Sequence, residues 1–301
     1  MSLMTIFGKM VVILFGVAAG FAANRLGYFT KETDRSLSRL ILNITMPAMI
    51  LATVMTGDEL PPTETILSGL GVSAIFYGLG IAFMLVMPRL LGGTAGEKGV
   101  WGFSFLFPNL AFIGYPVITA LLGKEALLFA VILVLPSNLL NYMVGPSLLG
   151  GGKFNWKSLL TPAVISAVIS LAIALLRIET PALLGEMLDL VGSSTVPLSL
   201  MVLGSLLSGM QAKDVFSNPR MWVVAAIRLA VMPLIILLIL RPMNLNELVL
   251  GVAVLETAMP VALNGTMLSM EYGGDTDCMA RTIFLTTIFS MVTIPLVAML
   301  L

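Results

Sequence analysis

The sequence contains no histidine and a single cysteine, Cys278. Without an imidazole, the chain has neither a histidine metal ligand nor a histidine proton relay. One thiol alone makes neither a disulfide framework nor a cysteine-based metal site. Lys plus Arg equals Asp plus Glu, and no basic stretch occurs, so the composition gives no reason to expect a nucleic-acid partner.

The residue sets of several enzyme classes are missing as well. Ser/His and Cys/His pairs are excluded because there is no histidine, and no lysine lies in the middle of an apolar segment to serve a serine–lysine intramembrane site. We therefore expect neither an enzyme nor a bound cofactor.

Charge is scarce and apolar sequence is abundant. Charged residues make up 11% of the chain and hydrophobic residues 58%, with a mean hydropathy of +1.04, whereas charged residues are about 25% of average soluble domains. Ten apolar segments each come near the ~20 residues that cross a hydrocarbon core of ~30 Å. They are Leu3–Ala23, Leu37–Met55, Thr65–Met87, Gly99–Leu122, Ala126–Leu149, Leu159–Leu176, Val191–Leu207, Met221–Leu240, Leu248–Met270 and Thr282–Leu301. The sequence thus predicts an all-α, multi-pass membrane protein with ten spans.

Loop charges predict the orientation of these spans. Arg25, Lys31 and Arg35 follow the first segment, while the loop after the second has acidic residues but no Lys or Arg. Loops rich in basic residues and loops poor in them continue to alternate along the chain. The positive-inside rule then places both termini on the outer side of the cell (inner) membrane. The first segment also resembles a signal peptide, with Lys9 before its apolar run, but the internal repeat favours a span.

The two halves of the chain match at an offset of 150 residues. Thr45-Met46-Pro47 falls on Thr195-Val196-Pro197, and Pro108–Pro116 falls on Ala258–Thr266. Residues 1–150 and 151–301 would each hold five spans, and an odd number inverts the second half in the membrane. Inverted repeats place a binding site at the midplane between discontinuous helices. Chance coincidence of prolines is the alternative.

Two stretches within the repeat are poor continuous helices, Phe107–Pro116 and Glu256–Gly265. Pro116 has no N–H to donate, and Gly114 relaxes the backbone further. Freed backbone groups in lipid cost several kcal/mol each unless protein or cavity water satisfies them. We expect the two stretches to lie together, with helix N-termini that favour an anion.

Glu256 lies about 12 Å deep in the ninth segment at ~1.5 Å per residue. A lone carboxylate at such depth costs at least ~2.5 kcal/mol. Either it binds a coupling ion, Na⁺ or H⁺, or Arg228 or hydrogen bonds from the fourth or fifth segment neutralise it. We favour the coupling ion.

Other polar residues within the spans have two interpretations each. Asn109 and Asn264 suit a carboxylate or repair of the broken backbone, since an amide both donates and accepts. Ser137, Asn138 and Asn141 share one helix face, which either supplies oxygens to an ion or makes interhelical hydrogen bonds.

Arg228 in the eighth segment is an isolated basic residue. It could neutralise a substrate carboxylate, or its long side chain could reach the interface as a membrane anchor. We favour the anchor.

Four stretches resemble a known family. Asn109–Pro116 resembles the fourth-span motif of the auxin efflux carrier family, which includes bacterial malate and malonate permeases. Ala258–Asn264, Glu271–Asp275 and Thr293–Leu296 are similar to that family's C-terminal signature. The chain is also similar, more distantly, to the bile acid:sodium symporter fold, in which a ninth-span Glu and polar residues of spans 4 and 5 bind Na⁺.

The resemblance implies two inverted five-helix repeats with broken helices 4 and 9 crossing inside a transport bundle. Helices 3–5 and 8–10 would form that bundle, and helices 1, 2, 6 and 7 a scaffold with a homodimer surface. Movement would be elevator-like. Only Gly150–Ser158 joins the halves here, as in bacterial members rather than plant ones.

The sequence therefore predicts a secondary active transporter of a small organic anion, a carboxylate such as malate or malonate or an auxin-like acid, coupled to Na⁺ or H⁺. A membrane sensor that binds its ligand without moving it is the alternative. The predicted substrate-binding residues are Asn109, Leu110, Gly114, Tyr115, Pro116, Thr257, Pro260 and Asn264. The predicted coupling-ion residues are Glu256, Asn109, Ser137, Asn138, Asn141 and Met259.

Overall fold

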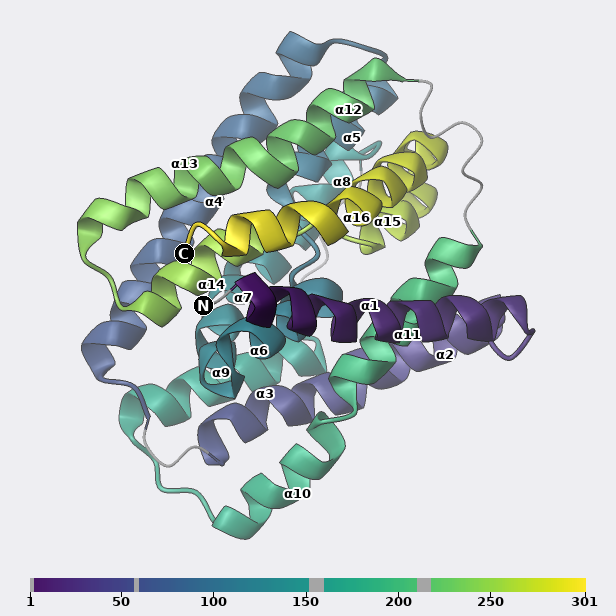
Figure 1. Ribbon diagram of the computed structural model, residues 1–301. Coiled ribbons are helices and arrows are strands. Elements are labelled where there is room, and N and C mark those ends of the chain that lie inside the picture. Colours follow the sequence, from purple (N-terminus) through teal and green to yellow (C-terminus); the bar gives the residue numbers. More distant parts are fainter. Residues whose placement is uncertain (1–2, 57–59, 152–159, 210–217) are drawn as a thin grey trace.

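A computed structural model describes residues 3–56, 60–151, 160–209 and 218–301, and regular structure in these ranges is helical (Figure 1). The helices are α1 Leu3–Arg25, α2 Lys31–Leu40, α3 Met46–Met55, α4 Thr63–Leu91, α5 Ala95–Leu106, α6 Tyr115–Leu122, α7 Leu127–Met143, α8 Gly145–Leu148, α9 Pro162–Leu176, α10 Ala182–Gly192, α11 Thr195–Ser208, α12 Pro219–Ala226, α13 Met232–Leu240, α14 Glu247–Thr257, α15 Asn264–Tyr272 and α16 Thr276–Ala298. Three π-helical turns, Ile41–Thr45, Leu110–Gly114 and Ile227–Val231, precede α3, α6 and α13 respectively.

Six helices in the described ranges are long and apolar enough to cross a membrane. They are Phe7–Arg25, Lys31–Met55, Thr63–Leu91, Ala182–Ser208, Pro219–Met243 and Thr276–Ala298. Two shorter apolar helices, Leu110–Leu122 and Pro162–Leu176, accompany them. The predicted helical, multi-pass membrane character is confirmed, while the count of ten spans stays a prediction.

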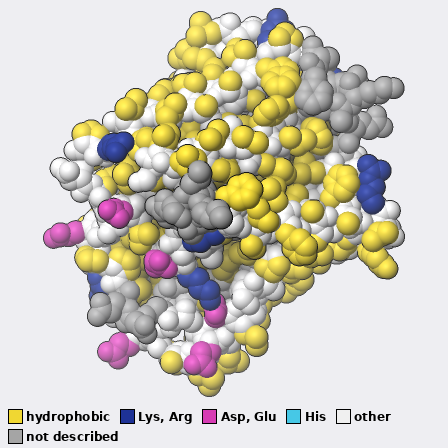
Figure 2. All heavy atoms as spheres, in the orientation of Figure 1, with side chains coloured by type: hydrophobic (Ala, Val, Ile, Leu, Met, Phe, Trp, Pro, Cys, Tyr) yellow, Lys and Arg dark blue, Asp and Glu magenta, His cyan; other side chains and the backbone are white. Residues whose placement is uncertain are grey.

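The outer surface is apolar, as a lipid-facing surface must be. Large side chains such as Phe15, which is 75% exposed, point away from the protein. Figure 2 shows one face covered largely by hydrophobic side chains, with Asp and Glu gathered toward its lower left. Such a surface is stable against hydrocarbon and unfavourable in water.

Two helices begin earlier than the sequence predicts. The second predicted segment starts at Leu37, but its helix starts at Lys31, where the Thr30 hydroxyl accepts a hydrogen bond from the Thr33 N–H. The seventh starts at Val191, but α10 begins nine residues earlier at Ala182. In both cases polar residues lower the local hydropathy without ending the helix, so hydropathy alone places the start too late.

The first segment is an integral part of the fold. Helix α1 lies along α11 (Figure 1), where a Cβ on Gly20 would be 1.9 Å from the Met201 carbonyl oxygen and one on Gly204 would be 1.9 Å from that of Val17. Only glycine permits such close approach of two helix backbones, which is typical of helix pairs in membranes.

Candidate functional site

The two interrupted stretches meet and pair with each other. Pro108 and Val261 form an isolated antiparallel β-bridge. The Asn109 N–H donates to the Pro260 carbonyl at 2.7 Å, and the Ala262 N–H donates to the Phe107 carbonyl at 3.0 Å. Each break thus satisfies backbone groups of the other, which explains how irregular backbone is tolerated among buried helices.

The positions of the breaks differ slightly from the expectation. The fourth predicted span is interrupted at 107–109, between α5 and the π-helical turn, whereas Gly114 lies within that turn and Pro116 lies in the first turn of α6. The π-helical turn continues directly into α6, so Pro116 lies inside the Leu110–Leu122 helix. The wider turn, in which the Tyr115 N–H donates to the Leu110 carbonyl five residues earlier, accommodates the N–H that the proline lacks. The second interruption, 258–263, separates α14 from α15 and contains Pro260.

Asn109 repairs part of the broken backbone and leaves part of its amide free. Its Oδ1 accepts a hydrogen bond from the Phe112 N–H at 3.2 Å and so caps the π-helical turn. Its Nδ2 is buried and makes no hydrogen bond within the described part of the chain. A buried amide donor without a partner is unfavourable by about 1–3 kcal/mol, so this group is suited to a ligand oxygen.

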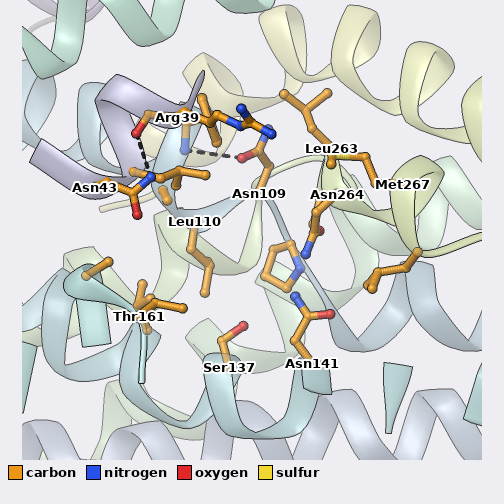
Figure 3. Close-up of a pocket in the computed structure, with 18 of the residues that line it drawn as sticks. Arg39, Asn43, Asn109, Leu110, Ser137, Asn141, Thr161, Leu263, Asn264 and Met267 are labelled. Carbon is orange, nitrogen blue, oxygen red and sulfur yellow. Dashed lines mark hydrogen bonds between the residues drawn. The ribbon is translucent and has the colours of Figure 1, made fainter. Parts of the chain in front are cut away.

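A cavity of about 400 Å³ lies against the crossing. Figure 3 shows Arg39 and Asn109 along one edge of it and Ser137 and Asn141 along the opposite edge. The lining residues are Arg39, Leu42, Asn43, Pro108, Asn109, Leu110, Ala111, Phe112, Val134, Ser137, Asn141, Thr161, Ala163, Ala262, Leu263, Asn264, Met267, Leu268 and Glu271. The start of the Leu110–Leu122 helix and the start of α15 both face this space, so two positive helix ends converge on it.

The structure divides the predicted site residues into two groups. Asn109, Leu110, Ser137, Asn141 and Asn264 line the cavity. The others lie outside its lining, most of them buried around the crossing: Gly114, Tyr115, Pro116, Glu256, Thr257, Met259 and Pro260. Asn138 lies on α7, but its side chain is outside the described residues. The roles of both groups stay predictions.

Glu256 is completely buried on α14, and neither of its carboxylate oxygens has a hydrogen-bond partner within the described residues. The backbone of Gly114 lies beside it, since a Cβ built there would be 3.1 Å from Oε1. No basic residue in the described ranges lies within 4 Å of this carboxylate. Hydrogen bonds from the fourth segment do not neutralise it either, so among the described residues it is without a direct partner.

Arg228 does not reach the membrane interface, and the anchor interpretation is wrong. The residue is 1% exposed. Its Nε donates to the Met259 carbonyl at 3.1 Å and its Nη1 donates to the Phe105 carbonyl at 3.4 Å. A guanidinium needs hydrogen-bond acceptors when it is buried. The carbonyls at the interrupted helices accept from Nε and Nη1, while Nη2 has no partner among the described residues.

Comparison with known proteins decides the family. A family model described as "Membrane transport protein" matches residues 5–150 and 147–298. The chain belongs to this membrane transport protein family. It is the family that the resemblance to auxin efflux carriers indicates, and its members are transport proteins rather than enzymes.

Relatives of this transport protein share its full length. An uncharacterized transporter of Methanocaldococcus jannaschii is 27% identical over 308 residues, 95% of this chain and 96% of the relative. One of Methanothermobacter thermautotrophicus is 24% identical over 299 residues, 97% and 96% respectively. A Rhizobium meliloti protein named "Putative malonate transporter" is 23% identical over 301 residues, 95% and 92%.

Sequence reasoning missed Arg39 and Asn43 as lining residues of the transport protein's cavity. The two residues are four apart, and the Asn43 Nδ2 donates to the Arg39 carbonyl at 2.8 Å. That spacing places them on one helix face. It indicates a polar face on the second segment, and the structure turns this face toward the cavity that Asn109 also lines.

Proposed function

We propose that this protein is a secondary active transporter of a small organic anion, which binds in the cavity beside the crossing of the two interrupted helices. The observation that carries the proposal is the convergence of both breaks on one cavity of about 400 Å³. This volume falls within the ~300–1,000 Å³ typical of small-molecule sites, and interrupted helices at a midplane site are typical of transporters.

The charges around the cavity support an anion as the ligand. Two helix N-termini face the space, and the amides of Asn109 and Asn264 line it together with Arg39. The half-positive charge of a helix end and amide donors both stabilise a carboxylate. Glu271 is the acidic residue in the lining. Its negative charge would repel an anion large enough to extend from the breaks to this carboxylate.

The substrate class we propose is a small carboxylate, such as malate, malonate or an auxin-like acid. The relative named for malonate matches this chain across nearly its whole length. In the proposed mechanism the carboxylate accepts a hydrogen bond from the unpaired Nδ2 of Asn109 and lies against the positive ends of the two helices.

Glu256 is the proposed site of the coupling ion, Na⁺ or H⁺. Its carboxylate is fully buried without a partner in the described residues, which is costly unless a cation or a proton accompanies it. Glu256 lies outside the lining of the cavity and next to Gly114 of the first interrupted stretch, so the ion and the anion would be bound at separate positions near the same two breaks.

The proposed transport cycle moves the bundle of helices 3–5 and 8–10 against a scaffold of helices 1, 2, 6 and 7 in an elevator-like way. The scaffold would also form a homodimer. Antiparallel pairing of the two breaks supports the inverted repeat on which this division rests. We place both termini outside the cell membrane.

The coupling role is tested by Glu256→Gln in proteoliposomes. We expect uptake of the accepted carboxylate to fall at least about tenfold, with its dependence on Na⁺ or pH abolished, because the neutral amide no longer requires a cation. The substrate is first chosen by thermal-shift screening of dicarboxylates and monocarboxylates with Na⁺ replaced by K⁺, since a ligand at 100 times its Kd stabilises by ~2.7 kcal/mol.

The matched control is Glu247→Gln, the same change at an exposed position in the first turn of α14. It should leave uptake unchanged. Uptake by Glu256→Gln with an unaltered ion dependence would remove Glu256 from the coupling role, and absence of any carboxylate binding or uptake would refute the proposed function itself.

A further inference from the structure

The Arg228 side chain joins three parts of the chain at the crossing. Arg228 lies in the π-helical turn between α12 and α13. Its Nε donates to the carbonyl of Met259, just past the end of α14, and its Nη1 donates to the carbonyl of Phe105 in the last turn of α5. The side chain is 1% exposed, so water does not replace these contacts.

The two accepting carbonyls belong to the interrupted ends. In a continuous helix the Asn109 N–H would donate to the Phe105 carbonyl four residues earlier. Here that N–H donates to Pro260 across the crossing instead. The Phe105 carbonyl is therefore freed by the break itself, and Arg228 takes the place of the missing donor.

The chemistry of the side chain fits this position. The last carbonyls of a helix carry a partial negative charge that a cation stabilises, and two such ends meet here. Arginine presents several donors in a planar fork, so a single side chain reaches two acceptors at once, which a lysine ammonium does less well. The Arg228 Nη1 also approaches the Met232 sulfur at 3.6 Å.

The crossing therefore has two sides of opposite character. Its positive helix starts face the cavity, at Leu110 and Asn264. Its negative helix ends face Arg228. The carboxylate of Glu256 is not within ion-pair distance of Arg228, so the guanidinium is held by backbone carbonyls rather than by that carboxylate.

We propose that Arg228 is a positioning residue that ties the ends of α5 and α14 to the α12–α13 helix and so holds the two paired breaks together as one unit. The inference deepens the proposed function, because the same breaks line the proposed anion site. Its test reads the crossing directly and does not depend on transport.

The test is hydrogen–deuterium exchange of the purified full-length protein in detergent, followed by mass spectrometry of peptides that contain Asn109 and Ala262. Those two amides make the hydrogen bonds across the crossing. In Arg228→Met, their exchange should accelerate by about ten- to a hundredfold, because hydrogen bonds from a charged donor are lost. Arg220→Met, on the exposed start of α12, is the control and should leave this exchange unchanged.

We call the hydrogen bonds from Arg228 to the two carbonyls the tether. Two further variants distinguish loss of the tether from loss of charge balance. In Arg228→Met with Glu256→Gln both buried charges near the crossing are removed, but the carbonyls are still without their donor, so exchange should stay fast. Arg228→Lys keeps the charge with fewer well-placed donors and should exchange at an intermediate rate, and it also serves if Arg228→Met does not fold.

Slow exchange restored in the double variant would overturn the tether in favour of charge balance. Slow exchange in a folded Arg228→Met or Arg228→Lys protein would overturn it as well. Anion affinity, measured by thermal shift in the same samples, separates the two proposals: accelerated exchange without any anion binding in the unaltered protein supports the tether and refutes only the proposed function.

Discussion

At the scale of single residues, the site is built from groups that the backbone leaves without partners. The Asn109 amide uses its oxygen to cap a helical turn, and its nitrogen has no partner in the described part of the chain. The same holds for both carboxylate oxygens of Glu256, and Gly114 beside it provides room, since a Cβ there would be 3.1 Å from Oε1. Burial of an amide or a carboxylate without a hydrogen-bond partner is unfavourable, and a ligand that pairs with the group removes this cost.

The two break asparagines should respond differently to truncation. Asn264→Ala should leave stability nearly unchanged, because the Asn264 side chain makes no hydrogen bond within the described residues, while Asn109→Ala should lose about 0.5–2 kcal/mol with its cap. Both should weaken carboxylate binding. Thermal unfolding with and without ligand measures the two effects.

Equal loss of stability in both asparagine variants would contradict the cap assigned to Asn109. Unchanged carboxylate binding in both would remove the amides from the anion site.

At the scale of elements, the start of α5 is fixed by charge at the edge of the membrane. Thr94 and Glu97 form a capping box, in which the Thr94 N–H donates to the Glu97 Oε2 at 2.8 Å. The Asn218 Nδ2 donates to the same carboxylate at 2.8 Å and joins it to the start of α12. The Thr94 N–H, with Asn218 and Arg220, holds the pKa of Glu97 below its ordinary value of 4.5.

A lowered pKa in the folded state means that the ionised Glu97 stabilises the protein at pH values above its ordinary pKa. This contribution is lost as the pH falls through the lower, folded pKa. Glu97→Gln should therefore be less stable than the unaltered protein by about 0.3–1 kcal/mol at neutral pH, and the difference should close in acid.

Thermal unfolding of both proteins in detergent at a series of pH values measures this difference. Glu186→Gln on exposed α10 is the control and should show no such pH-dependent gap. A gap for Glu97→Gln that persists unchanged in acid would show that packing, rather than charge, makes the contribution.

At the scale of the whole molecule, the cavity is lined by residues from the ends of several segments. Arg39, Thr161 and Glu271 line it together, and they come from ends of segments that the loop charges assign to the inner side. In contrast, Lys124 pairs with Asp189 at 2.9 Å in segments that the loop charges assign to the outer side. We propose that, in the topology that the loop charges predict, this cavity opens to the inner side.

Cysteine labelling tests this orientation. Asn43→Cys, at an exposed position in the lining of the cavity, should react with a membrane-impermeant maleimide in inside-out vesicles only, and an accepted carboxylate should slow the reaction. Lys124→Cys, whose parent side chain is 69% exposed, should react in right-side-out cells only. Cys278 is buried, so it contributes little background.

The reverse pattern of labelling would invert the proposed topology. Labelling of Asn43→Cys without protection by any carboxylate would place the anion elsewhere.

The sequence by itself determined the class of the molecule, because a lipid-facing helix needs a long apolar run and such runs are legible without a fold. It also located the two interrupted stretches, since proline has no backbone N–H to donate to a helix and glycine adopts non-helical backbone conformations readily. Only the tertiary structure decided what satisfies the freed groups: the breaks satisfy each other through Asn109 and Ala262, and Arg228, expected at the interface, satisfies the carbonyl of Phe105. Those partners are more than a hundred residues apart along the chain, and hydrogen bonding over such separations depends on how helices pack, which local pattern does not encode.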